Sequence, residues 1–172
     1  MQNSKFLDNP DLQLILFGGK GGSGKTISSA ATALHLSKIR PEKKILIISI
    51  DPAHSLGDSL DIIIGNKITH IVGNIWGYEI DADELLEKYK AEHGAIIKKI
   101  AERGTYFDKE DIENFFVMSL PGLDEVMAII KIANILNSGE YDLIILDTAP
   151  TGHTTVFLSL PEKMEKWVEV AE

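Results

Sequence analysis

The hydrophobic residues of this 172-residue chain gather in short, largely uninterrupted runs. Residues 44–50 (KILIISI) and 141–147 (YDLIILD) contain few polar positions, residues 12–17 form a third apolar run, and residues 75–80 form a weaker one. Strands of a parallel sheet are buried on both faces, so they read as continuous apolar segments and not as alternating ones. We therefore predict strands at these four places.

Segments with helical periodicity lie between these runs. They cover residues 27–40, 83 to about 103, and 123 to about 137. The first ends before Pro41, and Gly139 follows the last. Strands that alternate with helices form right-handed βαβ units and a sheet covered by helices. We predict one α/β domain over residues 1–172, with a helical insertion over residues 82–137 because that stretch is longer than one crossover needs.

A glycine-rich segment lies between the first strand and the first helix. It has the pattern G-x-x-x-x-G-K-[ST] and consists of Gly19, Lys20, Gly21, Gly22, Ser23, Gly24, Lys25 and Thr26. Glycines let successive backbone N–H groups turn toward phosphate oxygens, and the following helix adds the positive end of its dipole. Lys25 would carry charge to the β- and γ-phosphates, and the Thr26 hydroxyl would reach a magnesium ion. The segment predicts a binding site for a nucleoside triphosphate.

Carboxylates follow two of the apolar runs. Asp51 and Asp58 come after residues 44–50, and Asp147 ends the run 141–147. Carboxylates at the ends of parallel strands commonly hold a hydrated magnesium ion near phosphates, which makes Asp147 the Walker B candidate. A strand-ending aspartate can also serve only as a helix cap or turn former, and Asp58 alone reads equally well as an exposed loop carboxylate.

The composition narrows the classes of function. The formal net charge is −9, which argues against an extended basic surface for nucleic acid. The chain has no cysteine and therefore no disulfide and no thiolate metal site. The polar N-terminus does not resemble a signal peptide, and no apolar run approaches the roughly 20 residues that span a bilayer. We expect a cytoplasmic protein that is not itself transmembrane and has no nucleic-acid partner.

Three segments together resemble one family of ATPases. Lys20 gives the loop the K-G-G-x-G-K-[ST] signature of the deviant Walker A ATPases. Residues 51–58 (DPAHSLGD) and 147–154 (DTAPTGHT) resemble switch I and switch II of the ArsA/Get family, which includes the arsenite-pump ATPase and the ATPase that delivers tail-anchored proteins to membranes. Further similar segments are residues 78–81 (YEID), 121–125 (PGLDE) and 157–161 (FLSLP). The resemblance implies the fold of a P-loop NTPase.

The resemblance also implies roles for residues around the nucleotide. Lys25 and the loop amides would hold the phosphates of ATP. The metal ligands, directly or through water, would be Thr26, Asp51 and Asp147. Asp58 would position and polarise the attacking water. Lys20 would reach the nucleotide of a partner subunit, which is the logic of an arginine finger.

Switch II would comprise Asp147, Pro150, Thr151 and Gly152, and would move when the γ-phosphate leaves. His54 and His153 fall inside the two switch segments, where we expect structural hydrogen bonds and not metal binding. The chain departs from the family at Ser23, where valine is common. It also departs in length, because family members continue beyond residue 172 with their adenine-binding elements.

The resemblance points to magnesium-dependent ATP hydrolysis by a nucleotide-gated homodimer. The output would be targeting of tail-anchored membrane proteins or an anion or metalloid pump, through a membrane-protein segment or a membrane receptor. A partition or positioning ATPase of the same superfamily is one alternative, although the acidic composition disfavours it. A truncated nucleotide-binding scaffold without turnover is the other.

An apolar stripe in the helical insertion bears on cargo. Its residues are Val126, Met127, Ile129, Ile130, Ala133 and Leu136, preceded by Phe115, Phe116 and Met118. In the tail-anchored targeting branch of the family the helical subdomain builds a groove for a transmembrane helix. Apolar residues at helical spacing are more often core, and we expect most of these to be core.

Overall fold

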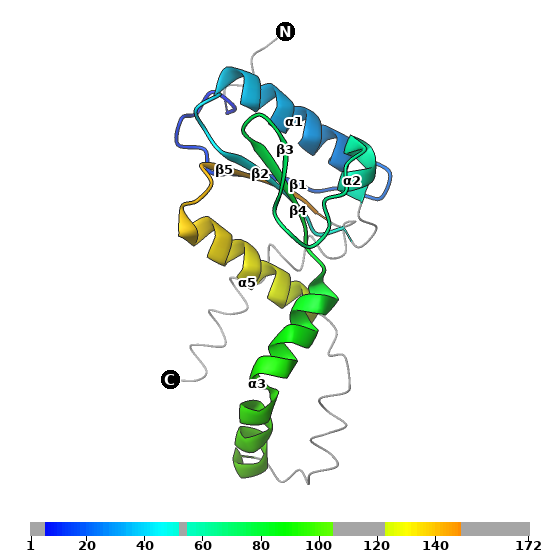
Figure 1. Ribbon diagram of the computed structural model, residues 1–172, viewed down its shortest axis with the longest axis vertical. Coiled ribbons are helices and arrows are strands. Elements are labelled where there is room, and N and C mark those ends of the chain that lie inside the picture. The colour runs from blue at the N-terminus through cyan, green and yellow to red at the C-terminus, as the bar shows by residue number, and fades with distance from the viewer. Residues whose placement is uncertain (1–5, 52–54, 105–122, 149–172) are drawn as a thin grey trace. The chain divides into compact units, whose positions relative to one another are not determined.

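The computed structural model describes residues 6–51, 55–104 and 123–148 (Figure 1). Within them the sheet has the order β1-β5-β2-β4-β3. Its strands are β1 (Leu14–Phe17), β2 (Ile45–Ser49), β3 (Thr69–Val72), β4 (Ile75–Glu79) and β5 (Leu143–Asp147). All neighbouring pairs are parallel except β3 with β4, which is antiparallel. The predicted α/β class with a mostly parallel sheet is confirmed.

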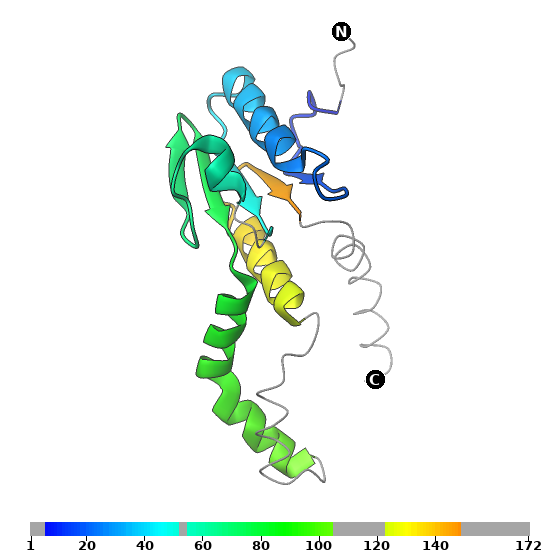
Figure 2. The ribbon, with the colours of Figure 1, turned by 90° about the vertical axis from the view of Figure 1, so that its right-hand side faces the viewer.

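Helix α1 (Lys25–Ile39) lies along one face of the sheet (Figure 2). Its buried residues are Ser29, Ala30, Ala33 and Leu36, which fall on one side of a helix. Three of these side chains are small, so the helix backbone approaches the strands closely. The core on this face joins α1 to three strands, to the short helix α2 (Ser55–Leu60) and to the segment before β3. Its buried residues are Ala33, Leu36, Ile45, Ile47, Leu56, Ile64, Ile75, Leu143 and Ile145.

The two central strands are buried on both faces, as their continuous apolar sequences predict. Every residue of β2 and of β5 is buried. On the face away from α1, the buried strand residues include Leu46, Ile48 and Ile144. The run 75–80, which the sequence indicated only weakly, is β4 and lies inside the sheet between β2 and β3.

Strand β3 was not predicted. It forms a hairpin with β4 through Gly73 and Asn74, and Gly73 has a φ of 56°, in the left-handed region that glycine adopts easily. Its residues Thr69–Val72 are alternately half-buried and exposed, as expected for an edge strand. A register irregularity between His70 and Val72 interrupts the pairing.

The chain divides into two compact units, one formed by Asp81–Ile130 and the other by Met1–Ile80 with Lys131–Glu172. Helix α3 (Ala82–Gly104) belongs to the first unit, and the Asp81 Oδ1 atom accepts a hydrogen bond of 2.9 Å from the Glu84 backbone N–H at its start. Helix α5 (Leu123–Ser138) crosses the boundary between the units. The helical insertion over residues 82–137 stays a prediction, because residues 105–122 lie outside the described part.

Helix α5 buries Ala128, Ile132 and Ile135, which are spaced four and three residues apart on one side. Our expectation for the apolar stripe is wrong for Ile130 and Ala133, which are exposed because they lie away from that side. The other stripe residues of this helix, Val126, Met127, Ile129 and Leu136, are half-buried. Phe115, Phe116 and Met118 lie outside the described residues. No helix in the described ranges combines the length and the apolar character needed to cross a membrane.

Candidate nucleotide and magnesium site

Four strands end in one row at the edge of the sheet that faces the start of α1. The register pairs Phe17 with Asp147, Asp147 with Ser49, and Ser49 with Glu79. Residues in one register row of a sheet point to the same face. Buried polar side chains therefore gather at this edge, where ligands bind in open parallel sheets. Asp147 and Ser49 are fully buried and Glu79 is 4% exposed.

The glycine-rich loop joins β1 to α1 at the same edge. Gly24 precedes α1 with a φ of 80° and a ψ of 22°, a left-handed conformation that a residue with a side chain adopts only under strain. A Cβ atom on Gly19 would lie 2.9 Å from Ser23 Oγ, so any side chain there would require the Ser23 hydroxyl to move. The Ser23 backbone N–H donates to the Lys20 carbonyl over 3.2 Å and closes the turn.

Lys25 begins α1 and its side chain turns back over the loop. Its Nζ atom donates a hydrogen bond of 3.3 Å to the Lys20 carbonyl oxygen. An ammonium group held above the loop amides lies where a phosphate in that loop would need a counter-charge. The loop geometry thus fits the predicted phosphate site.

Thr26 connects the loop to the ends of β2 and β5. Its hydroxyl donates to Asp147 Oδ2 over 2.6 Å, across a separation of 121 residues. The same hydroxyl lies 3.2 Å from Ser55 Oγ, and Ser55 donates to Asp51 Oδ2 over 3.1 Å. Ser55 begins the short helix α2 (Ser55–Leu60). The structure therefore brings together all three predicted magnesium ligands and adds the Ser55 hydroxyl.

Asp147 is a buried carboxylate with a hydrogen-bond partner for only one of its two oxygens among the described residues. Burial raises its pKa above the ordinary value, and the nearby Asp51 charge raises it further, while the Thr26 hydrogen bond and the Lys25 charge lower it. Among the described residues its Oδ1 atom is buried and has no hydrogen-bond partner. Buried polar atoms are nearly always satisfied, so this oxygen is suited to bind a group that the protein itself does not supply.

These donors fit a magnesium ion. Magnesium prefers oxygen ligands and is commonly held by one or two carboxylates together with substrate phosphates and water. The site offers the Thr26 hydroxyl, the unpaired Asp147 oxygen and Asp51. In the described part of the chain no group of three or more His, Asp or Glu side chains forms a metal cage of its own. A magnesium ion held by these groups would need phosphate or water oxygens to complete its coordination.

Two predicted residues stand apart from this cluster. Asp58 lies on α2 and is exposed, and Lys20 is exposed on the loop. Neither takes part in the hydrogen bonds that join Thr26, Ser55, Asp51 and Asp147. The roles of Asp58 and Lys20 at the nucleotide stay predictions. The remaining switch residues, Pro150, Thr151 and Gly152 with His54 and His153, lie outside the described residues.

Sequence reasoning gave no role to several residues of the site. Ser55 lies within the segment that resembles switch I. Ser49 ends β2, and its Oγ atom accepts a hydrogen bond of 3.3 Å from the Asp51 backbone N–H. Thr148 ties β5 to β1, because its hydroxyl donates to the Phe17 carbonyl over 2.9 Å. Glu79 falls within residues 78–81, a segment similar to the family to which the resemblance assigned no role. For Ser49, Glu79 and Thr148 the available signal was a polar residue at the end of an apolar run, whereas Ser55 lies within the segment 51–58 that resembles switch I.

The chain matches the anion-transporting ATPase family over residues 12–172. The chain belongs to this family. Among its relatives, the ATPase GET3 of Mycosarcoma maydis is 37% identical over 166 residues, which cover 93% of this chain and 46% of that protein. The ATPase ASNA1 homolog 2 of Paramecium tetraurelia is 40% identical over 164 residues, which cover 93% of this chain and 47% of that protein.

The resemblance to ArsA/Get ATPases is thereby confirmed at the level of the family. This chain spans about half the length of the curated relatives it matches. In this member of the anion-transporting ATPase family, the glycine-rich loop, α1 and the ends of β2 and β5 are all within the described residues.

Proposed function

We propose that this chain binds ATP and magnesium at the loop of residues 19–26 and hydrolyses ATP within a nucleotide-gated homodimer. The observation that carries the proposal is the hydrogen-bonded set of Thr26, Asp147, Ser55 and Asp51 beside the loop. A loop that only bound phosphate would not need two carboxylates and two hydroxyls at its end. Phosphoryl transfer needs such a set because positioning and charge stabilisation supply most of its catalysis.

The residues of the loop and those at the strand ends have different tasks in this proposal. The loop amides and Lys25 bind and orient the phosphates. They also neutralise the negative charge of the phosphates, next to the buried carboxyl ends of the strands. Thr26 and Asp147 would hold magnesium, with Asp51 contacting it directly or through water. When bound, the metal supplies positive charge to the β- and γ-phosphate oxygens.

The attacking water needs a carboxylate that accepts its hydrogen bond and orients it. We assign this task to Asp58 and assign Asp51 to the metal. The exposure of Asp58 is compatible with this task because the γ-phosphate and its water enter from solvent. Asp51 is the competing candidate, because Ser55 already joins it to the Thr26 hydroxyl.

Turnover measured over a range of magnesium concentrations, up to saturation, tests this assignment. We expect Asp58→Asn to lower kcat about a hundredfold with little change in the magnesium requirement. Asp51→Asn should instead raise the magnesium concentration needed for half-maximal turnover. Asp61→Asn is the matched control, since Asp61 is exposed just after the same helix and its left-handed φ of 53° suits asparagine.

Full turnover by the Asp58→Asn variant would transfer the water-positioning role to Asp51. Absence of turnover in the native chain would leave a nucleotide-binding scaffold and overturn the proposed hydrolysis. Magnesium-dependent binding of ATP, measured separately, distinguishes this scaffold from a chain that binds no nucleotide.

For the output of hydrolysis we propose work on a membrane-protein segment or a membrane receptor, in the cytoplasm. The resemblance to ArsA/Get ATPases supports this. The absence of cysteine from the 172 residues favours a membrane segment over a metalloid as the species bound by this chain, because thiolates are the ligands a soft metalloid would need. Stimulation of turnover by a synthetic transmembrane peptide, compared with arsenite, separates the two outputs.

A further inference from the structure

Glu79 is a buried carboxylate to which the proposed mechanism gives no task. It ends β4 and is 4% exposed, in the register row that also holds Ser49 and Asp147. Charged side chains are rarely buried unless specific partners hold them. Its partners therefore indicate what it does.

Both carboxylate oxygens of Glu79 accept hydrogen bonds from backbone N–H groups. Oε1 accepts from Gly57, within α2, over 2.9 Å, and Oε2 accepts from Gly65, beyond the helix, over 3.2 Å. The Glu79 backbone N–H donates to the Gly65 carbonyl over 3.0 Å. Hydrogen bonds to an ionised group are shorter and stronger than neutral ones. One side chain thus fixes α2 and the segment after it to the end of β4.

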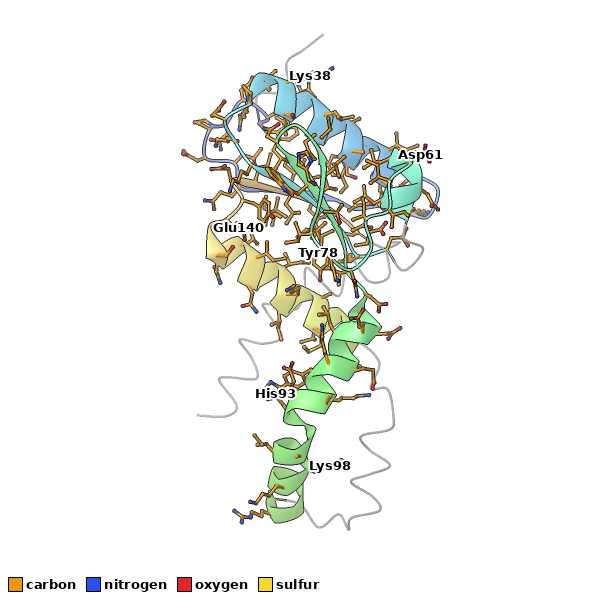
Figure 3. All side chains as sticks on the ribbon, in the orientation of Figure 1. Lys38, Asp61, Tyr78, His93, Lys98 and Glu140 are labelled. Atoms are coloured by element: carbon orange, nitrogen blue, oxygen red, sulfur yellow. The ribbon has the colours of Figure 1, made fainter. Side chains whose placement is uncertain are left out.

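The packing around Gly57 leaves α2 little room to shift. A Cβ atom at Gly57 would lie 2.7 Å from the Ile62 carbonyl oxygen and 3.5 Å from Glu79 Oε1. The Ile62 backbone N–H donates to the Gly57 carbonyl over 3.1 Å, and the chain turns at Asp61, which Figure 3 labels at the end of α2. The helix is therefore held by close contact as well as by the carboxylate.

The position of α2 matters because its first residue reaches the metal ligands. Ser55 Oγ lies 3.2 Å from Thr26 Oγ1 and donates to Asp51 Oδ2 over 3.1 Å. Only Leu56 lies between Ser55 and Gly57, whose amide Glu79 binds. A displacement of α2 by even 1 Å would break both Ser55 contacts, since hydrogen bonds weaken steeply beyond their normal length.

We propose that Glu79 is a positioning residue for the magnesium site, which acts by holding α2 so that Ser55 keeps Asp51 and Thr26 in the arrangement that binds the metal. The proposal rests on the proposed function, because it presumes that this site takes magnesium with ATP. The Glu79 carboxylate accepts hydrogen bonds from the Gly57 and Gly65 backbone N–H groups, so its proposed effect on the metal ligands passes through α2.

Glu79→Gln tests the proposal with almost no change of shape. The glutamine amide keeps one acceptor oxygen, but its NH2 group faces a backbone N–H and cannot accept from it. We expect the magnesium concentration for half-maximal binding of ATP to rise about tenfold, while the affinity for ATP in EDTA changes by less than about twofold. Hydrogen exchange at the Gly57 and Gly65 amides should become faster, a readout that needs no turnover.

Asp142→Asn is the matched control. The Asp142 carboxylate also accepts a backbone N–H bond, of 2.7 Å from Lys44, but at the opposite end of the sheet. We expect this variant to keep the native magnesium requirement. Gly57→Ala is a second route to the same displacement, through the contact with the Ile62 carbonyl, and should raise the magnesium requirement as Glu79→Gln does.

Three outcomes overturn the proposal. One is an unchanged magnesium requirement in Glu79→Gln despite faster exchange at Gly57. Another is an equal loss of ATP affinity with and without magnesium, which is the signature of general destabilisation. The third is an absence of magnesium-dependent binding in the native chain. If the native chain binds ATP with magnesium but does not hydrolyse it, only the proposed hydrolysis fails.

Discussion

At the scale of single residues, Thr26 is the centre of the site. Its hydroxyl donates to Asp147 and lies within reach of Ser55, so one side chain ties the loop to the end of β5 and to the start of α2. The buried Asp147 carboxylate receives this one hydrogen bond and keeps its other oxygen without a partner among the described residues. Such a group destabilises the ligand-free fold and stabilises the ligand-bound one, since a bound cation would neutralise it.

This imbalance predicts a reversal in stability for Asp147→Asn. Without magnesium at pH 8, we expect the variant to unfold with a free energy equal to or about 1 kcal/mol above that of the native chain, because burial opposes the charge and asparagine can still accept from Thr26. With magnesium and ATP the native chain should be the more stable, because only it gains the binding energy. Urea unfolding under both conditions measures the difference. The same ranking in both conditions would contradict the prediction.

At the scale of elements, α1 determines where the loop and Thr26 lie. Its buried side is made of Ser29, Ala30, Ala33 and Leu36, so the helix rests close against the sheet with Lys25 and Thr26 in its first turn. Small residues at such a contact set the distance between helix and strands. A larger residue there should move the whole helix or strain the core.

Ala33→Leu tests this close packing. Ala33 is fully buried within the core on the α1 face, and we expect the larger side chain to lower the free energy of unfolding by about 1–3 kcal/mol through overpacking. The matched control is Ala31→Leu on the same helix, where the residue is exposed and the change should stay within about 0.5 kcal/mol. Denaturant unfolding of both variants measures the contrast. Equal stability of the two would show that α1 does not set this distance.

The elements show why some structure could be predicted from the sequence and some could not. Strands β2 and β5 are buried on both faces, and their continuous apolar runs have no other simple explanation. Strand β3 has four residues at the edge of the sheet, too few for its alternation to stand out. Helix α2 has six residues, fewer than two turns, which is too short for a helical period to stand out in the sequence.

Within the site, too, local sequence patterns could be predicted and contacts between distant residues could not. The loop is a local pattern, so its residues could be named from eight consecutive positions. The Thr26–Asp147 bond joins residues 121 positions apart, and the sequence suggested that pair only because both motifs imply magnesium. The Glu79 carboxylate accepts hydrogen bonds from the backbone N–H groups of two glycines. A backbone donor carries no sequence signal, so this role became visible only in the folded chain.

At the scale of the whole molecule, charge bears on assembly. Each chain has a formal net charge of −9, so two copies repel one another at long range. ATP adds further negative charge. A dimer that closes over nucleotide therefore needs cations at its interface, and Lys20 is an exposed lysine on the loop that would hold the nucleotide. The proposed dimer thus depends on this side chain more than on the rest of the surface.

Mixing two inactive variants tests whether Lys20 acts across the dimer. Lys20→Ala lacks the donated lysine but keeps its own site, whereas Lys25→Ala has a disabled site but keeps Lys20. If Lys20 acts on the partner's nucleotide, each mixed dimer has one complete site, and an equal mixture should recover about a quarter of native turnover. Lys38→Ala, which removes an exposed lysine from the last turn of α1, should retain native turnover by itself.

A lysine that acts within its own chain would give no recovery on mixing, because neither variant then contains a complete site. The recovered rate should also fall on dilution, since the complete site exists only in the dimer.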